Sequence, residues 1–161
     1  MQVISTNFEG LYILEPKVFH DERGLFFESY NRANLESKGL SFEFVQDNQS
    51  YSKYGVLRGL HFQNGEYAQT KLIRVLKGEI LDVVVDLREN SSTYLQSFSK
   101  ILSSENKLQL LVPKGFAHGF VVLSPIADVL YKCDNYYNPS SEGGLRYDDP
   151  KLNIDWMISK E

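Results

Sequence analysis

The fold is decided by the stretch Lys71-Leu72-Ile73-Arg74-Val75-Leu76-Lys77-Gly78-Glu79-Ile80-Leu81-Asp82-Val83-Val84-Val85-Asp86-Leu87. It consists of two runs rich in aliphatic and β-branched residues, separated by Lys77-Gly78. Runs of this length and composition are typical of β-strands, and a glycine in so short a connection is typical of a tight hairpin. The stretch therefore predicts two strands joined at Gly78.

Similar short runs recur along the chain at residues 11–14, 24–30, 42–45, 108–112, 119–123 and 127–132. Turn residues separate them, notably at 89–92, 113–115 and 138–141. Only residues 32–38 have the pattern of a helix, with Gly39 as its left-handed cap. Evenly spaced strands without alternating helices favour an all-β jelly roll or barrel sandwich that encloses a small ligand.

Composition limits the possible functions. The chain has 161 residues, an apolar content of 42% and a formal net charge of −4. This length fits one domain, residues 1–161, with a sizeable core, and the negative charge argues against a general affinity for nucleic acid or an anionic membrane. The N-terminus is polar and no apolar stretch could span a bilayer, so we expect a cytoplasmic protein. The lone Cys133 can form no intrachain disulfide and is expected to be inert.

Ionisable side chains interrupt the β-forming runs at two places. Arg58-Gly59-Leu60-His61-Phe62-Gln63 precedes Lys71, and Pro113-Lys114-Gly115-Phe116-Ala117-His118-Gly119-Phe120 lies far downstream. Burying such groups costs free energy unless each of them meets a partner or a ligand. The pattern therefore predicts a pocket lined by these side chains.

Several ordered motifs together resemble the dTDP-4-dehydrorhamnose 3,5-epimerase family of cupin-fold nucleotide-sugar epimerases. They lie at residues 19–24, 46–50, 55–63, 82–88 and 113–120 and at the tyrosines of 131–137. One such motif would be weak support, whereas their order over nearly the whole chain makes chance agreement improbable. The resemblance implies a cupin-type double-stranded β-helix (jelly roll) with one short N-terminal helix. It also implies epimerisation at C3, C5 or both of a nucleotide-linked 4-keto-6-deoxy sugar, with dTDP-4-dehydro-6-deoxyglucose as the first candidate substrate. The reaction of the family needs no cofactor.

The reaction of this family needs a base, an acid on the opposite side of the sugar ring, and a cation near the developing enolate. The resemblance assigns these roles to His61, Tyr131 and Lys71. An imidazole of ordinary pKa, about 6.5, suits proton abstraction, and a phenol of pKa about 10 can donate if the charge of the site matches it to the enolate. Without the motifs, the same residues would be interpreted as a hydrogen-bonded histidine, a packed tyrosine and a solvated lysine.

The resemblance also implies a set of substrate-binding residues: Arg23, Glu28, Gln46, Asn48, Arg58, His118, Tyr137 and Glu142. Arg58 and Lys71 are the expected contacts of the pyrophosphate or the sugar, because a guanidinium can engage two phosphate oxygens at once. His118 either reaches the sugar or is a hydrogen-bonded histidine that closes a turn. Tyr137 is expected to stack on the substrate, and its neighbour Tyr136 to point to the other face.

In the family, the early strand region that carries Arg23 and Glu28 is exchanged between two subunits. The resemblance therefore implies a homodimer.

A metal-binding cupin would present two closely spaced histidines with a glutamate, and a third histidine on a later strand. Here Gln63 follows His61, only His118 remains downstream, and His20 is expected in a loop. We therefore expect no functional metal.

The C-terminus departs from the family pattern. Fuller members continue beyond the tryptophan that matches Trp156 with a Ser-x-Lys-Asp-like motif, whose Asp orients the catalytic histidine. This sequence has no Asp that aligns there, and Glu161 is at best a poor substitute. An unoriented His61 would be a weaker base, and Asp82 or Asp86 would be the first candidates to orient it.

Two other functions stay open at this point. A related cupin isomerase moves the keto group between C4 and C3 of a nucleotide-linked sugar with similar acid–base groups. A non-catalytic cupin would bind the sugar nucleotide without proton exchange. The nucleotide base and the exact sugar, hexose or heptose, are also open.

Overall fold

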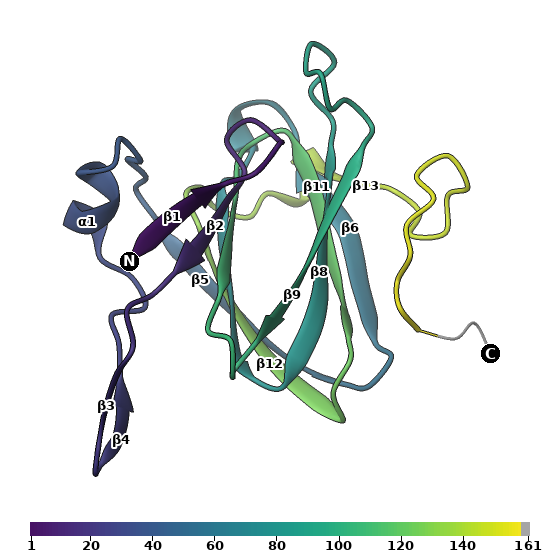
Figure 1. The fold of residues 1–161 in the computed structure, drawn as a ribbon. Helices are drawn as coiled ribbons and strands as arrows, with labels where there is room; N and C mark the ends of the chain where they lie inside the picture. Colours follow the sequence, from purple (N-terminus) through teal and green to yellow (C-terminus); the bar gives the residue numbers. More distant parts are fainter. Residues whose placement is uncertain (159–161) are drawn as a thin grey trace.

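Two antiparallel β-sheets face each other in the computed structural model, which describes residues 1–158 (Figure 1). The first sheet has the strand order β1 (Gln2–Ser5), β2 (Tyr12–Glu15), β10 (Gln109–Val112), β7 (Lys71–Lys77), β12 (Ile126–Cys133) and β5 (Gln46–Lys53). The second has the order β13 (Glu142–Gly144), β6 (Leu57–Gln63), β11 (Phe116–Val122), β8 (Glu79–Asp86) and β9 (Ser97–Ser103). From β5 to β13 the chain changes sheet at every connection except β8–β9. The predicted all-β jelly roll is confirmed.

The connection at Gly78 is a corner between the two sheets. β7 pairs with β10 and β12, whereas β8 pairs with β11 and β9. Gly78 has φ +79°, so the predicted tight turn is confirmed, but the predicted hairpin pairing of the two strands is wrong. Both edges of β8 are occupied by β11 and β9, so β8 has no edge left for β7. The faces of β8 are covered by the opposite sheet on one side and the C-terminal segment on the other.

Polarity changes along the inner faces of the sheets. One end of the space between them is filled by apolar side chains: Ile73 and Val75 of β7, Phe120 and Val122 of β11, and Ala127 and Val129 of β12. The other ends of β7 and β12 carry Lys71 and Tyr131, and His118 enters the same cavity from β11, where it lies between Phe116 and Phe120. Every second residue of a strand points to the same face, so one strand supplies both the core and the polar end. A cavity remains at the polar end.

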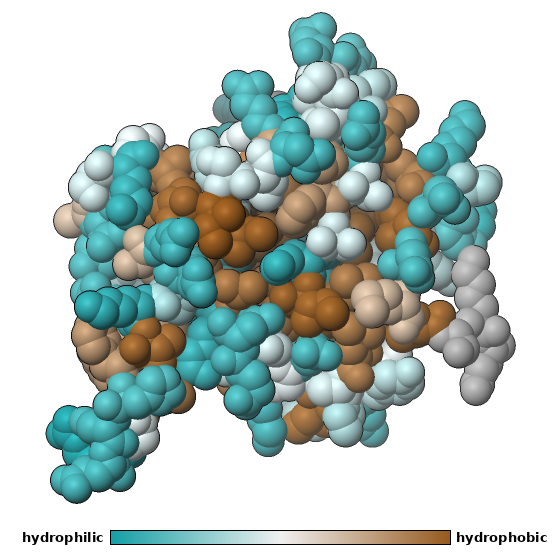
Figure 2. Space-filling view, viewed as in Figure 1, coloured by the Kyte–Doolittle hydropathy of each residue, from teal (hydrophilic) through white to brown (hydrophobic). Residues whose placement is uncertain are grey.

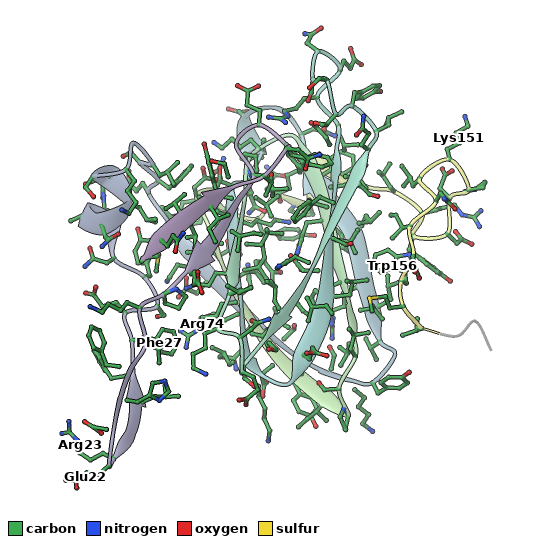
Figure 3. All side chains as sticks on the ribbon, in the orientation of Figure 1. Glu22, Arg23, Phe27, Arg74, Lys151 and Trp156 are labelled. Atoms are coloured by element: carbon green, nitrogen blue, oxygen red, sulfur yellow. The ribbon has the colours of Figure 1, made fainter. Side chains whose placement is uncertain are left out.

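Other parts of the chain cover the outer faces. Helix α1 (Arg32–Glu36) brings Leu35 into a cluster with Leu72 on the outside of the first sheet. Residues 145–158 follow β13 and bring Trp156 into a cluster with Val83 on the outside of the second sheet (Figure 3). Within residues 1–158, no helix is long and apolar enough to cross a membrane.

The short helix α1 is capped at both ends, and it ends at Glu36, two residues before the predicted Lys38. The side chain of Asn31 accepts a hydrogen bond from the backbone N–H of Asn34 at 3.1 Å. At the other end, Gly39 has φ +79°, and the N–H groups of Gly39 and Leu40 donate to the carbonyls of Glu36 and Leu35. This is a Schellman motif, and the predicted glycine cap is confirmed.

Several strand predictions need correction. Residues 42–45 are irregular, and the strand of this region is β5, whose inner face is polar because it lines the cavity. Phe42 and Phe44 alternate as in a strand, but they pack beside α1 instead of pairing. The predicted strand 24–30 is only β4 (Gly24–Phe26), which pairs with β3 (Phe19–Asp21). The strands β1, β3, β9 and β13 were not predicted. Two 3₁₀ turns, η1 (Gly65–Tyr67) and η2 (Pro139–Ser141), complete the described elements.

We expect Gly78→Ala to destabilise the protein by about 3 kcal/mol or more, because the residue has a positive φ and its new Cβ would overlap the carbonyl oxygen of Ile126. Gly39→Ala is the matched control, since Gly39 has the same φ of +79° but no atom within 4 Å of the position that its new Cβ would take. It should cost only about 1 kcal/mol. Urea unfolding of both variants tests this, and equal losses would contradict the steric role of Gly78.

Candidate active site

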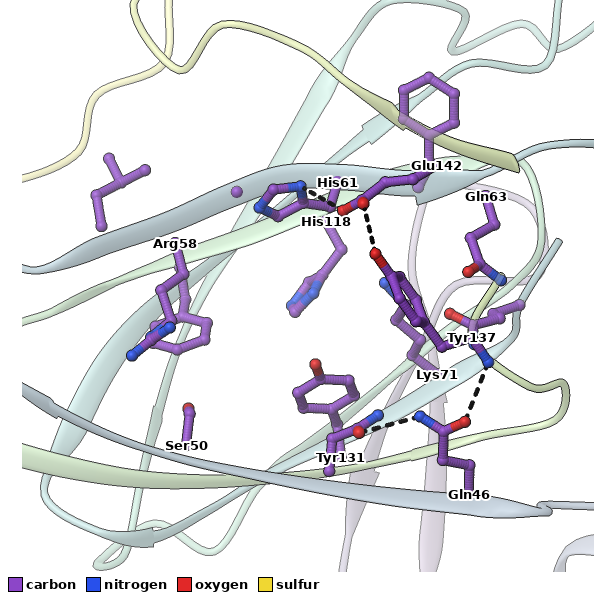
Figure 4. Close-up of a pocket in the computed structure, with 16 residues that line it drawn as sticks. Gln46, Ser50, Arg58, His61, Gln63, Lys71, His118, Tyr131, Tyr137 and Glu142 are labelled. Atoms are coloured by element: carbon purple, nitrogen blue, oxygen red, sulfur yellow. Dashed lines mark hydrogen bonds and ion pairs between the residues drawn. The ribbon is translucent and has the colours of Figure 1, made fainter. Parts of the chain in front are cut away.

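A cavity of about 550 Å³ opens at the polar end of the two sheets (Figure 4). Its wall includes nine of the eleven predicted site residues: His61, Lys71, Tyr131, Gln46, Asn48, Arg58, His118, Tyr137 and Glu142. The others that line it are Ser50, Leu57, Gly59, Phe62, Gln63, Gln69 and Phe120. Strands from both sheets contribute, so residues far apart in the sequence share one wall.

The two histidines of the cavity are cross-strand partners. His61 on β6 lies directly opposite His118 on β11 in the antiparallel register. They differ in exposure, since the side chain of His61 is 57% exposed and that of His118 only 7%. One imidazole is therefore accessible to a ligand and the other is held in the wall.

His118 is bound to a buried carboxylate. Its Nε2 lies 2.7 Å from Oδ1 of Asp82, which is completely buried on β8. The second oxygen of Asp82, Oδ2, has no hydrogen-bond partner among the described residues. Because a buried carboxylate is costly without compensation, this pair fixes the His118 ring in the wall of the cavity. The sequence had suggested Asp82 only as a candidate to orient His61.

Lys71 and Tyr131 lie on neighbouring strands of the first sheet, with the Lys71 ammonium 5.9 Å from the centre of the Tyr131 ring. Burial lowers the pKa of Lys71, against the attraction of Cys133, Asp82 and Glu142. Burial raises the pKa of Tyr131, while Arg58 opposes this shift. Tyr131 is therefore a neutral phenol at neutral pH, as a proton donor must be.

A chain of side-chain contacts runs along the rim of the cavity. Gln46 accepts a hydrogen bond from the backbone N–H of Tyr137 at 3.1 Å, and its amide donates to Asn48 at 3.0 Å. The Tyr137 hydroxyl donates to Oε2 of Glu142 at 2.8 Å. The other oxygen of Glu142, Oε1, lies 3.4 Å from Nδ1 of His61. The rim thus links β5 in one sheet to β6 in the other.

Cys133 lies under the cavity. It is a completely buried free thiol opposite Lys71 in the register of β7 and β12. The Asn48 amide donates to its sulfur at 3.7 Å, and burial raises its pKa. A buried thiol with a raised pKa is a poor nucleophile, in keeping with the expected inert role.

Arg58 is held by a buried serine. Its Nε donates to the hydroxyl of Ser52 at 3.0 Å, and Ser52 is almost fully buried on β5. This bond leaves the terminal guanidinium nitrogens available for an anionic ligand.

Gln63 was not predicted as a site residue. Its amide donates to the carbonyls of Tyr67 at 2.7 Å and Tyr136 at 3.1 Å, and its oxygen accepts from the N–H of Asn138 at 2.7 Å. Gln63 therefore anchors the loop that carries Tyr137 to β6. The sequence could have indicated that Gln63 lines the cavity, because it follows His61 by two residues and therefore lies on the same face of the strand.

Arg23 and Glu28 are not brought to the cavity of their own chain. Arg23 lies at the tip of the arm formed by β3 and β4, paired with Asp21 at 2.6 Å and with a side chain 85% exposed (Figure 3). Glu28 follows the arm and accepts a hydrogen bond from Asn31. In Figure 2 the arm stands clear of the body at lower left, with a hydrophilic tip.

The two aspartates that the sequence suggested as the residues orienting His61 have other partners. Asp82 contacts His118, and Asp86 accepts hydrogen bonds from Arg88, Ser91 and Thr93 at 2.6 to 2.8 Å. Neither is paired with His61, because β11 lies between their strand, β8, and the strand of His61, β6. Glu161, the other candidate, lies outside the described residues.

No group of three or more His, Cys, Asp or Glu residues within residues 1–158 is arranged to hold a metal ion. The absence of a functional metal stays a prediction.

The fold and the cavity together define a cupin-type enzyme whose pocket is equipped for acid–base chemistry on a charged ligand. Comparisons with known proteins agree. The family model described as dTDP-4-dehydrorhamnose 3,5-epimerase matches residues 5–161. The chain belongs to the dTDP-4-dehydrorhamnose 3,5-epimerase family, as predicted.

Three relatives show how similar this chain is to known members of the family in sequence and in structure. The dTDP-4-dehydrorhamnose 3,5-epimerase of Salmonella typhimurium is 55% identical over 161 residues, which cover 99% of this chain and 88% of that protein. The Bacillus anthracis enzyme, solved with TDP and PPi bound, is 51% identical with a TM-score of 0.96 and covers 99% and 91% of the two chains. The Legionella pneumophila enzyme, in complex with dTDP-4-keto-L-rhamnose, is 50% identical with a TM-score of 0.94 and covers 99% and 85%.

We expect Lys71→Met to raise the free energy of unfolding at neutral pH by about 1 kcal/mol, because it removes an ammonium whose burial is unfavourable. The folded-state pKa of Lys71 is lowered, so the native protein gains stability as the pH rises from that pKa to the unfolded value, 10.5. The advantage of the variant should therefore shrink towards pH 10.5.

Urea unfolding at several pH values measures this effect. Lys53→Met, at an exposed lysine of β5, is the control and should change stability by no more than about 0.5 kcal/mol. A loss of stability in Lys71→Met would show that the ammonium is compensated in the folded protein.

Proposed function

We propose that this chain epimerises C3 and C5 of dTDP-4-dehydro-6-deoxyglucose, with His61 as the base, Tyr131 as the acid and Lys71 as the cation beside the keto oxygen. The proposal is carried by one observation: His61 and Tyr131 enter the same cavity from opposite sheets, with Lys71 on the strand beside Tyr131 (Figure 4). A sugar ring bound between the sheets would have an accessible imidazole on one face and a phenol on the other.

The chemistry follows from the C4 keto group, which acidifies the hydrogens on C3 and C5. His61 takes a proton from one of these carbons, and the electron pair of the C–H bond moves into an enolate whose charge lies on the C4 oxygen. The Lys71 ammonium stabilises this charge in a partly dry site. Tyr131 then gives its hydroxyl proton to the same carbon from the opposite face, which inverts the centre. Exchange with solvent restores both groups.

The remaining residues of the cavity suit a sugar nucleotide. Arg58, fixed by Ser52, supplies a guanidinium for the diphosphate, and Gln46 and Asn48 supply amides for hydroxyl groups. Tyr137 offers an aromatic face at the rim. The TDP and PPi of the Bacillus anthracis enzyme and the dTDP-4-keto-L-rhamnose of the Legionella pneumophila enzyme support this ligand class.

The free thiol of Cys133 supports a cytoplasmic location.

We also propose that the protein works as a homodimer in which the β3–β4 arm completes the partner's site. The arm exposes apolar side chains, with Phe19 51%, Leu25 48% and Phe26 68% exposed. An arm of this kind is unfavourable in an isolated subunit, and a second copy would bury it. Arg23 at its tip would then bring a cation to the diphosphate.

We expect His61→Ala and Tyr131→Phe each to lower kcat by about a hundred- to ten-thousandfold with little effect on thermal stability, because each removes one proton-transfer group. The assay is incubation with dTDP-4-dehydro-6-deoxyglucose in D₂O, followed by NMR for deuterium at C3 and C5. Tyr54→Phe, at an exposed tyrosine outside the cavity, is the control for Tyr131→Phe.

The same assay separates the competing functions. A ketoisomerase would move the carbonyl from C4 to C3, and a binding cupin would exchange no label. Unchanged kcat in either variant would remove that residue from the mechanism.

We expect Arg23→Ala and His61→Ala to complement each other, because an exchanged arm separates these residues into different sites. In a mixed dimer, one site would have both native residues and the other site neither. Random mixing of subunits should restore about a quarter of wild-type activity from two impaired proteins. Co-expression with two affinity tags and an activity assay measure this, and no recovery in isolated mixed dimers would place Arg23 outside the partner's site.

A further inference from the structure

The strand β13 has the sequence Glu142-Gly143-Gly144 and can send only one side chain into the cavity. It pairs antiparallel with β6, so that Gly144 lies opposite His61 and Glu142 opposite Gln63. His61 and Glu142 are therefore diagonal neighbours on the same face of the sheet, within reach of long side chains. The glycine opposite His61 leaves room for the carboxylate to lean towards the imidazole.

Packing accounts for both glycines. A Cβ on Gly143 would lie 2.5 Å from the ring of Phe62, and a Cβ on Gly144 would lie 3.3 Å from the carbonyl oxygen of Leu60. A side chain at Gly143 would therefore displace the Phe62 ring, and one at Gly144 would make a tight contact with β6. The antiparallel pairing of β13 with β6 puts Glu142 beside His61.

The two oxygens of the Glu142 carboxylate have different neighbours. Oε2 accepts the hydrogen bond of the Tyr137 hydroxyl at 2.8 Å, and Oε1 lies 3.4 Å from Nδ1 of His61. The hydrogen bond to Glu142 raises the pKa of Tyr137, so the phenol keeps its proton and remains the donor. An ionised carboxylate only accepts hydrogen bonds. The bond from Tyr137 holds the Glu142 carboxylate in an orientation in which Oε1 points to the His61 imidazole.

Other carboxylates near the cavity are engaged elsewhere. Asp82 is bound to His118 and Asp86 to Arg88. Within residues 1–158, Glu142 is the acidic residue at ion-pair distance from His61.

We propose that Glu142 is the positioning residue of His61: its carboxylate selects the imidazole tautomer with the proton on Nδ1 and leaves the Nε2 lone pair free to take the proton of the substrate. This inference rests on the proposed function, in which His61 is the base, and adds the group that prepares it. Tyr137 acts on His61 indirectly, because its hydroxyl holds the carboxylate of Glu142.

The tautomer can be observed without substrate. Long-range ¹H–¹⁵N correlation NMR of protein labelled with [¹⁵N]histidine, at pH about 9 where an ordinary imidazole is neutral, distinguishes protonated Nδ1 from protonated Nε2. The chain has only three histidines, so His61→Ala identifies the His61 signals. We expect the Nδ1–H form in the native protein, the Nε2–H form favoured by free imidazole in Glu142→Ala, and a return of the Nδ1–H form in Glu142→Asp.

Kinetics with dTDP-4-dehydro-6-deoxyglucose provide the second measurement. Glu142→Ala should lower kcat by about tenfold or more, and Glu142→Asp should recover part of it, because a shorter carboxylate still accepts from Nδ1. Glu66→Gln removes a carboxylate from the neighbouring 3₁₀ turn outside the cavity and should change neither tautomer nor kcat.

An unchanged tautomer in Glu142→Ala, or a higher KM with native kcat, would overturn the inference and reduce Glu142 to a substrate contact. If the native protein failed to exchange C3 and C5 protons, the proposed function would fall, whereas the tautomer measurement would still decide the role of Glu142.

Discussion

The burial of charged groups between two β-sheets is the constraint on which this structure depends. A sandwich normally fills its interior with apolar side chains, as this one does at the end that contains Ile73 and Val129. On β8 the completely buried Asp82 lies between Ile80 and Val84 of this apolar cluster, and its bond to His118 offsets the cost of its burial. The cavity lies where the inner faces of the strands carry Lys71, His118 and Tyr131 instead of apolar side chains.

Two histidine–carboxylate pairs share this cavity in contrasting environments. The pair of His118 and Asp82 is buried and rigid, and it belongs to the wall. The pair of His61 and Glu142 is partly exposed, and its geometry depends on the register of the short strand β13 and on Tyr137. Similar side chains therefore serve different purposes because their access to solvent differs: a buried pair holds the structure, while an accessible imidazole can exchange protons.

The arm of β3 and β4 has few contacts within its own chain that would account for its position. It carries exposed apolar residues and a charged tip, yet it leaves the body that the rest of the sequence builds. Arg74 contacts Phe27 at its base, with the guanidinium 5.0 Å from the ring centre. The arm is therefore fixed where it leaves the body and free of contacts with its own cavity at the tip, as an element directed at a second subunit would be.

The sequence was enough to predict the all-β class, the glycine cap at Gly39, the family and most of the residues around the cavity, because these depend on local patterns and ordered motifs. It did not determine that Gly78 turns between sheets, that residues 42–45 pack without pairing, or that Asp82 binds His118. Those outcomes depend on which faces meet after the chain crosses from one sheet to the other. The neighbour of His61 was decided in the same way, since a carboxylate 81 residues away in the chain reaches it only through the β6–β13 register. Strand periodicity gives the face of each residue, but only tertiary packing decides which faces meet.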